Sequence, residues 1–362
     1  MVRPGTHRTR GERNMTGTLV LKHRPEDFRV RENLVLALTD EAAADQRYLL
    51  LHKRGYTTME AVRLVADRLG VPSRDVGYAG LKDEDGITEQ LLSVPLKAPA
   101  ALGELTSAGL VEERGPDRLL SLSHYGYGRE PLRVGRLNGN GFRVVLRGLD
   151  ETTAAHLADR HRMNLLFVNY YDTQRFGVPG GPKRTHLVGE ALLKEDWALA
   201  RRELAGLGAP ESGIAERWDG TDQDLFRELD PRTVAFYLAA HSSYEWNAQV
   251  RELVATNCPE ESAETRVDGL PYRFPTTGRA VAALLAACHE LPYMRYAYQD
   301  GPVERPTVRP TVIQTTVTAE EEGPDEEFPG RRAVEVSFLL PSGCYATAAL
   351  RQLIAQCSEP VS

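Results

Sequence analysis

The residues of this sequence that could do chemistry gather in one short turn, residues 79–84 (AGLKDE). The turn follows a strand-like run and places the carboxylate of Asp83 beside the cation of Lys82. A nearby cation favours the ionised form of a carboxylate. The same arrangement is also typical of a solvated acid in a surface turn, so the pattern alone leaves both interpretations open.

The rest of the sequence excludes several common catalytic classes. It has no His-Glu-x-x-His motif, no Gly-x-x-x-x-Gly-Lys-Ser/Thr loop, no Gly-x-Gly-x-x-Gly turn and no Gly-x-Ser-x-Gly elbow. Its four cysteines stand at least 13 residues apart, at Cys258, Cys288, Cys344 and Cys357. That spacing suits neither a zinc site nor a disulfide framework, so we predict four reduced packing residues. We therefore expect no metal and no cofactor.

Composition and charge describe an ordinary globular chain with an uneven charge distribution. The 362 residues are 41% hydrophobic and 26% charged, which allows two domains. The net charge of −7 argues against a surface that is basic throughout. Residues 1–16 are interpreted as a disordered basic arm, and residues 320–327, with six acids, as a solvated acidic loop. Without a membrane-spanning run or a secretory signal, we expect a cytoplasmic protein.

Strand patterns dominate both ends of the chain, and helical patterns dominate the middle. Alternating or apolar runs predict strands near residues 18–32, 48–52, 87–94, 141–147 and 334–340. Helical spacing and caps predict helices near residues 57–69, 150–163, 230–257, 280–291 and 346–356. We predict an α+β fold with a mixed, largely antiparallel sheet and flanking helices. Residues 17–165 and 306–362 would form this domain, and residues 166–305 a mainly helical insertion.

Five motifs, taken in order along the chain, resemble those of the TruD family of pseudouridine synthases. Residues 24–30 (RPEDFRV), with Lys22 before them, resemble the family's entry motif, and residues 79–90 (AGLKDEDGITEQ) resemble its catalytic loop. The other matches are residues 137–147 (LNGNGFRVVLR), 169–177 (NYYDTQRFG) and 340–351 (LPSGCYATAALR). Each motif alone is weak, but the ordered set is strong. The implied fold is a pseudouridine synthase-like catalytic domain with an inserted TRUD-type domain.

The resemblance implies isomerisation of uridine to pseudouridine. The N1–C1′ bond breaks, uracil turns, and C5 joins C1′. Asp83 would stabilise or capture the positive charge that develops on the ribose, much as a carboxylate does in retaining glycosidases. The cation beside it is Lys22 or Lys82, and the resemblance favours Lys22. The detached base is itself the returning nucleophile, so the site must exclude water.

The resemblance also implies substrate-binding residues, each of which has a plainer alternative. Phe142 would lie against the uracil face, or it is a core aromatic of a strand. Asn140 would hydrogen-bond the uracil edge or the ribose, or it is a turn residue. Phe28 and Tyr345 would line the substrate pocket, although packing also explains Tyr345.

Departures from the family pattern affect the loop and the domain junction. Gly86 stands where the family usually has Ala, which predicts a looser loop. Gln174 and Arg175 could contact phosphate, but an arginine that ties the inserted domain to the sheet explains the pattern equally well. Asp172 adds a negative charge close by, which would repel a phosphate. Residues 178–305 show few of the family's landmarks.

Three functions remain open at this point. The first is a pseudouridine synthase that acts on uridine in RNA, most simply tRNA, with the target base flipped out of its stack. The second is the same isomerisation on a free uridine nucleotide such as UMP, as in TruD-like enzymes of C-nucleoside antibiotic pathways. The acidic balance and the divergent middle favour this second function. The third is an RNA-binding module without turnover.

Overall fold

The chain divides into two compact units, which we call the sheet unit and the helical unit. The computed structural model describes residues 12–14, 17–82, 84–97, 110–113, 118–177 and 181–357. The sheet unit comprises Arg8–Met163 and Thr316–Gly343, and the helical unit comprises Asn164–Thr315 and Cys344–Ser362. The segment from Cys344 onward therefore belongs with the central part of the chain, although the sequence pattern groups it with the catalytic domain.

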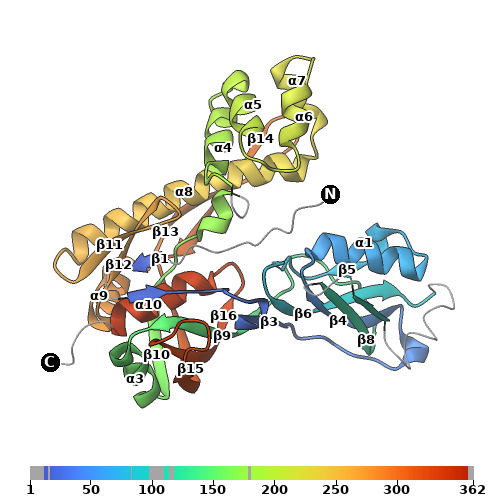
Figure 1. The fold of residues 1–362 in the computed structure, drawn as a ribbon. Helices are drawn as coiled ribbons and strands as arrows, with labels where there is room; N and C mark the ends of the chain where they lie inside the picture. Colours follow the sequence, from blue (N-terminus) through green and yellow to red (C-terminus); the bar gives the residue numbers. More distant parts are fainter. Residues whose placement is uncertain are drawn as a thin grey trace. The chain divides into compact units, whose positions relative to one another are not determined.

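The sheet unit is built on a large mixed sheet (Figure 1). Its strands are β3 (Phe28–Asn33), β4 (Gln46–Arg54), β5 (Gly77–Tyr78), β6 (Ile87–Pro95), β7 (Leu110–Glu113), β8 (Leu119–Gly128), β9 (Gly139–Leu149), β10 (Arg162–Val168), β15 (Val312–Pro324) and β16 (Arg332–Pro341). The order is β10-β15-β16-β9-β3-β6-β4-β8-β7, and β5 also pairs with β6. Strands β10 and β15 continue past the boundary between the units. The described ladders are antiparallel except β3–β6, which confirms the predicted α+β class.

Helix α1 (Thr58–Leu69) covers the β4–β6 part of this sheet, as Figure 1 shows. Thr57 caps it: the hydroxyl accepts from the Glu60 amide, and the Glu60 carboxylate accepts from the Thr57 amide. Gly70 ends it in the left-handed conformation, with a φ of 64°. The buried helix positions recur at helical spacing and pack on apolar residues of β4, β6 and β8. The predicted helix near residues 57–69 is confirmed.

The helical unit is organised around one long helix, α8 (Pro231–Asn257). Asp230 caps it by accepting from the Arg232 amide at 2.7 Å, and Pro231 occupies the first position. The other helices are α4 (Thr185–Leu193), α5 (Trp197–Ala205), α6 (Ser212–Arg217), α7 (Asp222–Glu228), α9 (Gly278–Ala287) and α10 (Ala346–Cys357). No helix in the described ranges is both long and apolar enough to cross a membrane.

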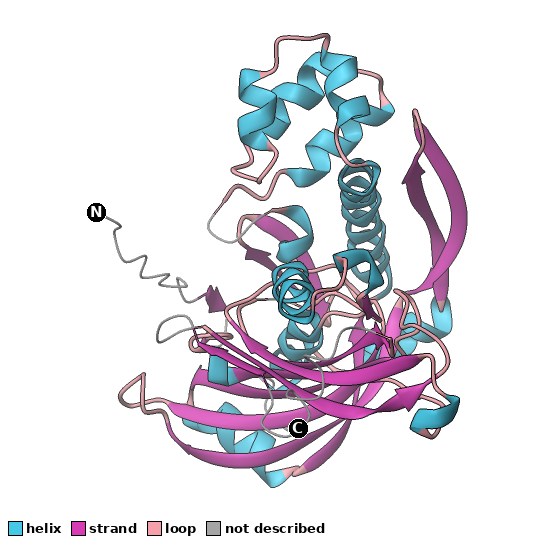
Figure 2. Ribbon diagram, turned by 90° about the vertical axis from the view of Figure 1, so that its right-hand side faces the viewer, coloured by secondary structure: helices cyan, strands magenta, loops and turns pink. Residues whose placement is uncertain are grey.

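This unit also contains two antiparallel hairpins that the helical pattern does not predict. They are β11 (Ser262–Val267) with β12 (Leu270–Pro275), and β13 (Glu290–Tyr298) with β14 (Pro302–Pro310). The second hairpin packs along α8, as Figure 2 shows. The helix predicted near residues 280–291 ends earlier, at Ala287, and the chain continues into β13, which contains Pro292.

Two further segments, residues 150–163 and the predicted basic arm, also differ in detail from the predictions. The helix expected near residues 150–163 is the shorter α3 (Glu151–Asp159), followed by β10. Within the predicted basic arm, residues 1–11 and 15–16 lie outside the described residues. The short strand β1 (Glu12–Asn14) pairs with β2 (Gly17–Leu19).

The acidic segment, residues 320–327, is solvent-exposed at most of its acids, as the sequence predicts, but it is largely a strand and not a loop. Most of it belongs to β15, and the turn that follows contacts Arg24 and Arg147. The carboxylate of Asp325 is fully buried and accepts from Arg147 at 3.0 Å. Glu327 lies 3.1 Å from the guanidinium of Arg24. Asp325 is the one buried acid of this segment, and the other five acids are exposed.

Candidate active site

Asp83 lies outside the described residues, and the site is built from the residues around it. Three adjacent strands of the sheet unit, β3, β9 and β16, bring together residues that are far apart in sequence. Phe142 is directly opposite Val30 on one side and Phe338 on the other. The Phe142 ring stacks on Phe338 at 5.3 Å between centroids and meets the edge of Phe28 at 5.9 Å. Lys22, Phe28, Asn140 and Phe142 are all in this unit.

The entry motif places Phe28 in this cluster through a buried acid. Residues Pro25–Asp27 form a single 3-10 turn, and the Asp27 carboxylate accepts from the Arg24 amide at 3.0 Å. The same carboxylate accepts twice from the guanidinium of Arg147, at 2.7 and 2.8 Å. Bidentate pairing of this kind fixes orientation as well as position. Phe28 then begins β3 with its ring buried.

Lys22 lies beside the aromatic cluster in an unusual backbone conformation. Its φ is 55°, in the left-handed region that costs a residue with a side chain about 1 kcal/mol or more. Its ammonium lies 4.4 Å from the centre of the Phe28 ring, within cation–π distance. Strain of this kind is found at functional sites, where the surrounding structure holds a side chain in place.

Lys82, the alternative cation, forms a buried ion pair with Glu32. Its ammonium lies 2.8 Å from a carboxylate oxygen of Glu32, and the two side chains are only 5% and 2% exposed. The other carboxylate oxygen of Glu32 accepts from the Leu91 amide at 3.1 Å. The charge of Lys82 is therefore paired with Glu32 in a buried site. The pairing of Lys22 with Asp83 stays a prediction.

Asn140 presents an unsatisfied polar atom in the same strand as Phe142. Its backbone is paired with Glu32 on β3 and Leu340 on β16. Its side-chain oxygen is buried and has no hydrogen-bond partner among the described residues. A buried acceptor without a donor costs about 1–3 kcal/mol, which a bound ligand with an N–H or O–H group would relieve. The preceding residue, Gly139, lies very close to β16, since a Cβ at Gly139 would overlap the Leu340 carbonyl.

Phe142 fulfils the plainer of its two predicted roles, because its side chain forms part of the core. The residue is 9% exposed and contacts two other phenylalanines. Its contact with uracil stays a prediction.

The remaining predicted site residues belong to the helical unit. Arg175 donates to the Ser243 hydroxyl at 3.3 Å and lies over the Phe236 ring at 4.9 Å, and both partners are on α8. Gln174 is half-buried in the same 3-10 turn, Thr173–Phe176. Tyr345 meets the edge of another tyrosine of its unit, Tyr171, at 5.7 Å between centroids. A phosphate contact for Gln174 and Arg175 and a pocket role for Tyr345 stay predictions.

Asp172, which the sequence analysis expects to repel a phosphate, is a buried and paired acid. It is 3% exposed, and its carboxylate lies 2.5 Å from the guanidinium of Arg351 on α10. The expected repulsion of a phosphate is therefore wrong, because the negative charge is neutralised inside the helical unit.

Gly86 also differs from its prediction. Its backbone is buried against Phe28, and a Cβ at this position would overlap the carbonyl oxygen of Phe28. The glycine therefore allows the end of the loop to approach the first residue of β3 closely, rather than loosening it.

We expect Gly86→Ala to destabilise the protein by about 1–3 kcal/mol, because the clash is with backbone and no side chain can move aside. Urea unfolding monitored by circular dichroism measures this change. Gly323→Ala is the matched control in the same unit, since nothing lies within contact distance of a Cβ there. Equal stability of Gly86→Ala and the wild type would show that the loop and β3 separate freely.

Three buried residues around the loop were not predicted: Glu32, Lys53 and Thr58. The sequence pattern around each of them could have indicated burial, through the strand alternation for Glu32 and Lys53 and through the start of the helix for Thr58. Lys53 alternates with Leu49 and Leu51 on the inward side of β4, and all three are buried. Glu32 likewise alternates with buried residues of β3. A charge on an apolar face is more informative than a charge on a polar one.

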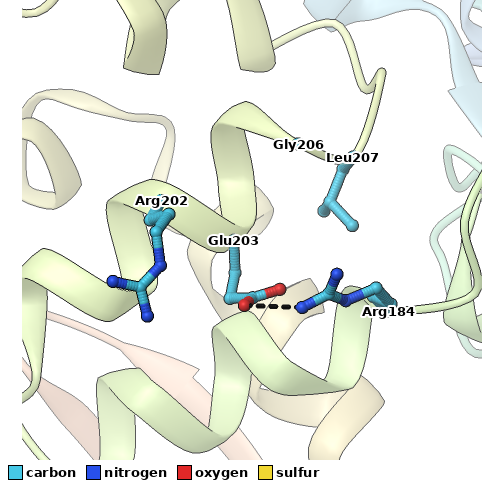
Figure 3. Close-up of a pocket in the computed structure, with 5 residues that line it drawn as sticks. All are labelled: Arg184, Arg202, Glu203, Gly206 and Leu207. Carbon is cyan, nitrogen blue, oxygen red and sulfur yellow. Dashed lines mark hydrogen bonds and ion pairs between the residues drawn. The ribbon is translucent and has the colours of Figure 1, made fainter.

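A hollow of about 190 Å³ lies elsewhere, between α4 and α5 in the helical unit. Figure 3 shows Arg184 reaching across it to Glu203, with 2.8 Å between their charged atoms. None of the predicted site residues lines this hollow. All four cysteines are free thiols, and the described residues contain no group of three or more His, Cys, Asp or Glu side chains placed to hold a metal ion.

Comparison with known proteins decides the family. The model of the family described as tRNA pseudouridine synthase D (TruD) matches residues 10–269. This chain belongs to the TruD family. Tyr345 lies beyond the matched residues of the TruD model, whereas the other predicted site residues lie within them.

Curated TruD relatives match a little more than half of the chain. The tRNA pseudouridine synthase D of Geobacter sulfurreducens is 39% identical over 209 residues, which are 56% of this chain and 46% of that protein. The one from an Anaeromyxobacter species (strain Fw109-5) is 41% identical over 189 residues, 51% of this chain and 48% of that protein. The chain thus spans about half the length of these relatives.

A solved structure supports the TruD fold over almost the whole chain. A crystal structure from Methanosarcina mazei, described as a tRNA pseudouridine synthase D (TruD), covers 95% of this chain and 94% of its own. The TM-score is 0.57 at 20% sequence identity. This likeness concerns the fold.

Proposed function

We propose that this protein isomerises uridine to pseudouridine in tRNA, with Asp83 as the essential carboxylate. The main support is the position of Phe28, Asn140 and Phe142 on neighbouring strands, with the Lys22 ammonium over the Phe28 ring and a loop nearby that is held by buried partners. The relatives named tRNA pseudouridine synthase D support the substrate class.

Each residue has a role that its surroundings suit. Asp83 is ionised and stabilises or captures the positive charge at C1′ when the N1–C1′ bond breaks. Lys22 keeps that carboxylate charged. The unsatisfied oxygen of Asn140 accepts from uracil or a ribose hydroxyl. Phe28 and Phe142 provide an apolar wall that keeps water from the ribose while the base turns.

A second candidate is the same isomerisation on a free uridine nucleotide. The net charge of −7 favours it, because an acidic protein attracts the phosphates of a large RNA weakly. The reacting residues and their roles would be the same in both functions.

We expect the protein to form pseudouridine in a tRNA transcript and not in UMP. The two substrates are incubated separately with the enzyme, and the digested products are analysed for pseudouridine by mass spectrometry. Conversion of UMP with none in tRNA would replace the first function by the second. Binding of tRNA without conversion of either substrate would indicate a binding module. Asp83→Asn protein serves as the inactive control.

A further inference from the structure

We propose that a buried hydrogen-bond network around Glu32 and Lys82 positions the loop that carries Asp83. This inference rests on the proposed function, because it assigns positioning roles for that reaction. The network consists of side chains from β3, β4, β6 and the first turn of α1. These side chains bind the backbone of Gly80 and Lys82, which precede Asp83 in this loop, and the side chain of Lys82.

The ion pair between Glu32 and Lys82 connects the loop to two parallel strands. The pair is 2.8 Å long and almost fully buried. Glu32 extends from β3, and its second oxygen accepts from the Leu91 amide in β6. Both oxygens of the Glu32 carboxylate are therefore held, one by the Leu91 amide and one by Lys82. Because Glu32 is anchored in the sheet, it determines the position of the Lys82 ammonium.

Backbone groups of the loop are held by three further buried side chains. The Lys82 amide donates to the Thr58 hydroxyl at 2.8 Å, and the Lys82 carbonyl accepts from the Lys53 ammonium at 3.4 Å. The Thr58 hydroxyl donates to the Gln90 side-chain oxygen at 3.0 Å. The Gln90 amide group donates to the Gly80 carbonyl at 3.3 Å.

Stability alone does not account for this arrangement. Burying charged and polar groups is costly, and an apolar replacement of a buried ion pair is often neutral or stabilising. A polar network does fix geometry, because each hydrogen bond has a defined length and direction. Reaction at C1′ requires a carboxylate placed within a fraction of an ångström, and a displacement of about 1 Å costs about 100-fold in rate. The network supplies this precision by fixing the backbone and side chain of Lys82, the residue that precedes Asp83.

The positioning role predicts a specific pattern of kinetics. We expect Glu32→Gln and Lys82→Gln each to lower kcat on tRNA about 100-fold while changing KM less than about twofold. The double variant should recover part of the loss, because no unpaired buried charge is left. If Lys82 instead acted directly on Asp83, Glu32→Gln would leave kcat unchanged or raise it, and that result would overturn the proposal.

Two controls separate positioning from general destabilisation. Glu130→Gln removes an exposed ion pair with Arg136 in the same unit and should leave kcat unchanged. All rates are measured well below the melting temperature of each variant. A lower melting temperature with normal kcat would assign the network to stability and contradict the proposal.

Thr58 offers a milder test if the charge variants fail to fold. Thr58→Val removes the hydroxyl that accepts from the Lys82 amide, and we expect about a 10-fold lower kcat, while Thr58→Ser retains activity. Hydrogen exchange at the Lys82 amide should be faster in Thr58→Val than in the wild type. Unchanged exchange would refute the network even if the enzyme is inactive on every substrate. Inactivity of the wild type on tRNA and UMP would overturn the proposed function alone.

Discussion

Asp83→Asn is expected to lower the rate of pseudouridine formation by at least about 1000-fold while the protein stays folded. The substitution keeps the size of the side chain and removes its charge and its nucleophilic oxygen. Removing one preorganised stabilising group typically costs 100- to 1000-fold in rate, and loss of a group that forms a covalent bond costs more. Single-turnover assays on the preferred substrate, followed by mass spectrometry, measure the effect.

A matched variant lies two residues further along the same loop. Asp85 is exposed, and Asp85→Asn removes the same charge without touching the proposed reacting group. We expect its rate to stay within about threefold of the wild type, because exposed charges are screened by solvent. Circular dichroism should show the same melting curve for both variants. Equal rates for Asp83→Asn and Asp85→Asn would rule out Asp83 as the essential carboxylate.

The sequence predicted the elements of the site better than their mutual contacts. Alternation and capping are local properties, so the strand with Phe142 and the helix that begins after Thr57 were predictable. The register that sets Phe142 opposite Val30 and Phe338 is not local. It depends on which strands pair, and the chain separates Phe28 from Phe338 by about 300 residues.

Charged residues were the least predictable part. Asp325 lies in an acidic run and Asp172 beside polar residues, and both patterns are typical of solvent-exposed loops. In the structure each carboxylate is buried against an arginine more than 170 residues away in sequence. A single sequence contains no information on such partners. The burial of Lys53 was not predicted either, although alternation from Leu49 onward along β4 places it on the buried side.

The contact between Gly86 and Phe28 shows the same limit at a smaller scale. A glycine in a loop predicts freedom of the backbone when only its neighbours in sequence are known. Close approach of another strand reverses that conclusion, because the missing Cβ then allows tight packing. Candidate residues of the site could thus be named from motifs, whereas the partners that hold them required the fold.

Arg147→Met is expected to destabilise the sheet unit by about 3–5 kcal/mol at pH 7. The guanidinium pairs with two buried carboxylates, Asp27 and Asp325, and its removal leaves both negative charges unpaired in the interior. Burial raises the pKa of Asp325, but hydrogen bonds from backbone amides and the pairing with Arg147 outweigh it and hold that pKa below its ordinary value of 3.8. Urea unfolding at several pH values measures the effect.

The pH dependence has a definite sign. Because the folded protein lowers the pKa of Asp325, this group stabilises the wild type above about pH 4 and loses that contribution as the pH falls through the lowered pKa. Without Arg147 the lowering of the Asp325 pKa is smaller, so this carboxyl group binds a proton at higher pH and acidification destabilises the variant less than the wild type. The difference in unfolding free energy between wild type and Arg147→Met should therefore be largest near pH 7 and shrink toward pH 4.

The neighbouring arginine of the same strand provides the comparison. Arg143 pairs with Glu335 at the surface, where its side chain is 49% exposed, so Arg143→Met should cost less than about 1 kcal/mol. Adding Asp27→Asn and Asp325→Asn to Arg147→Met should restore part of the stability, because no buried charge is then left unpaired. If both arginine variants lost equally little stability, the buried pairs would not hold the entry motif, and Phe28 would owe its position to packing alone.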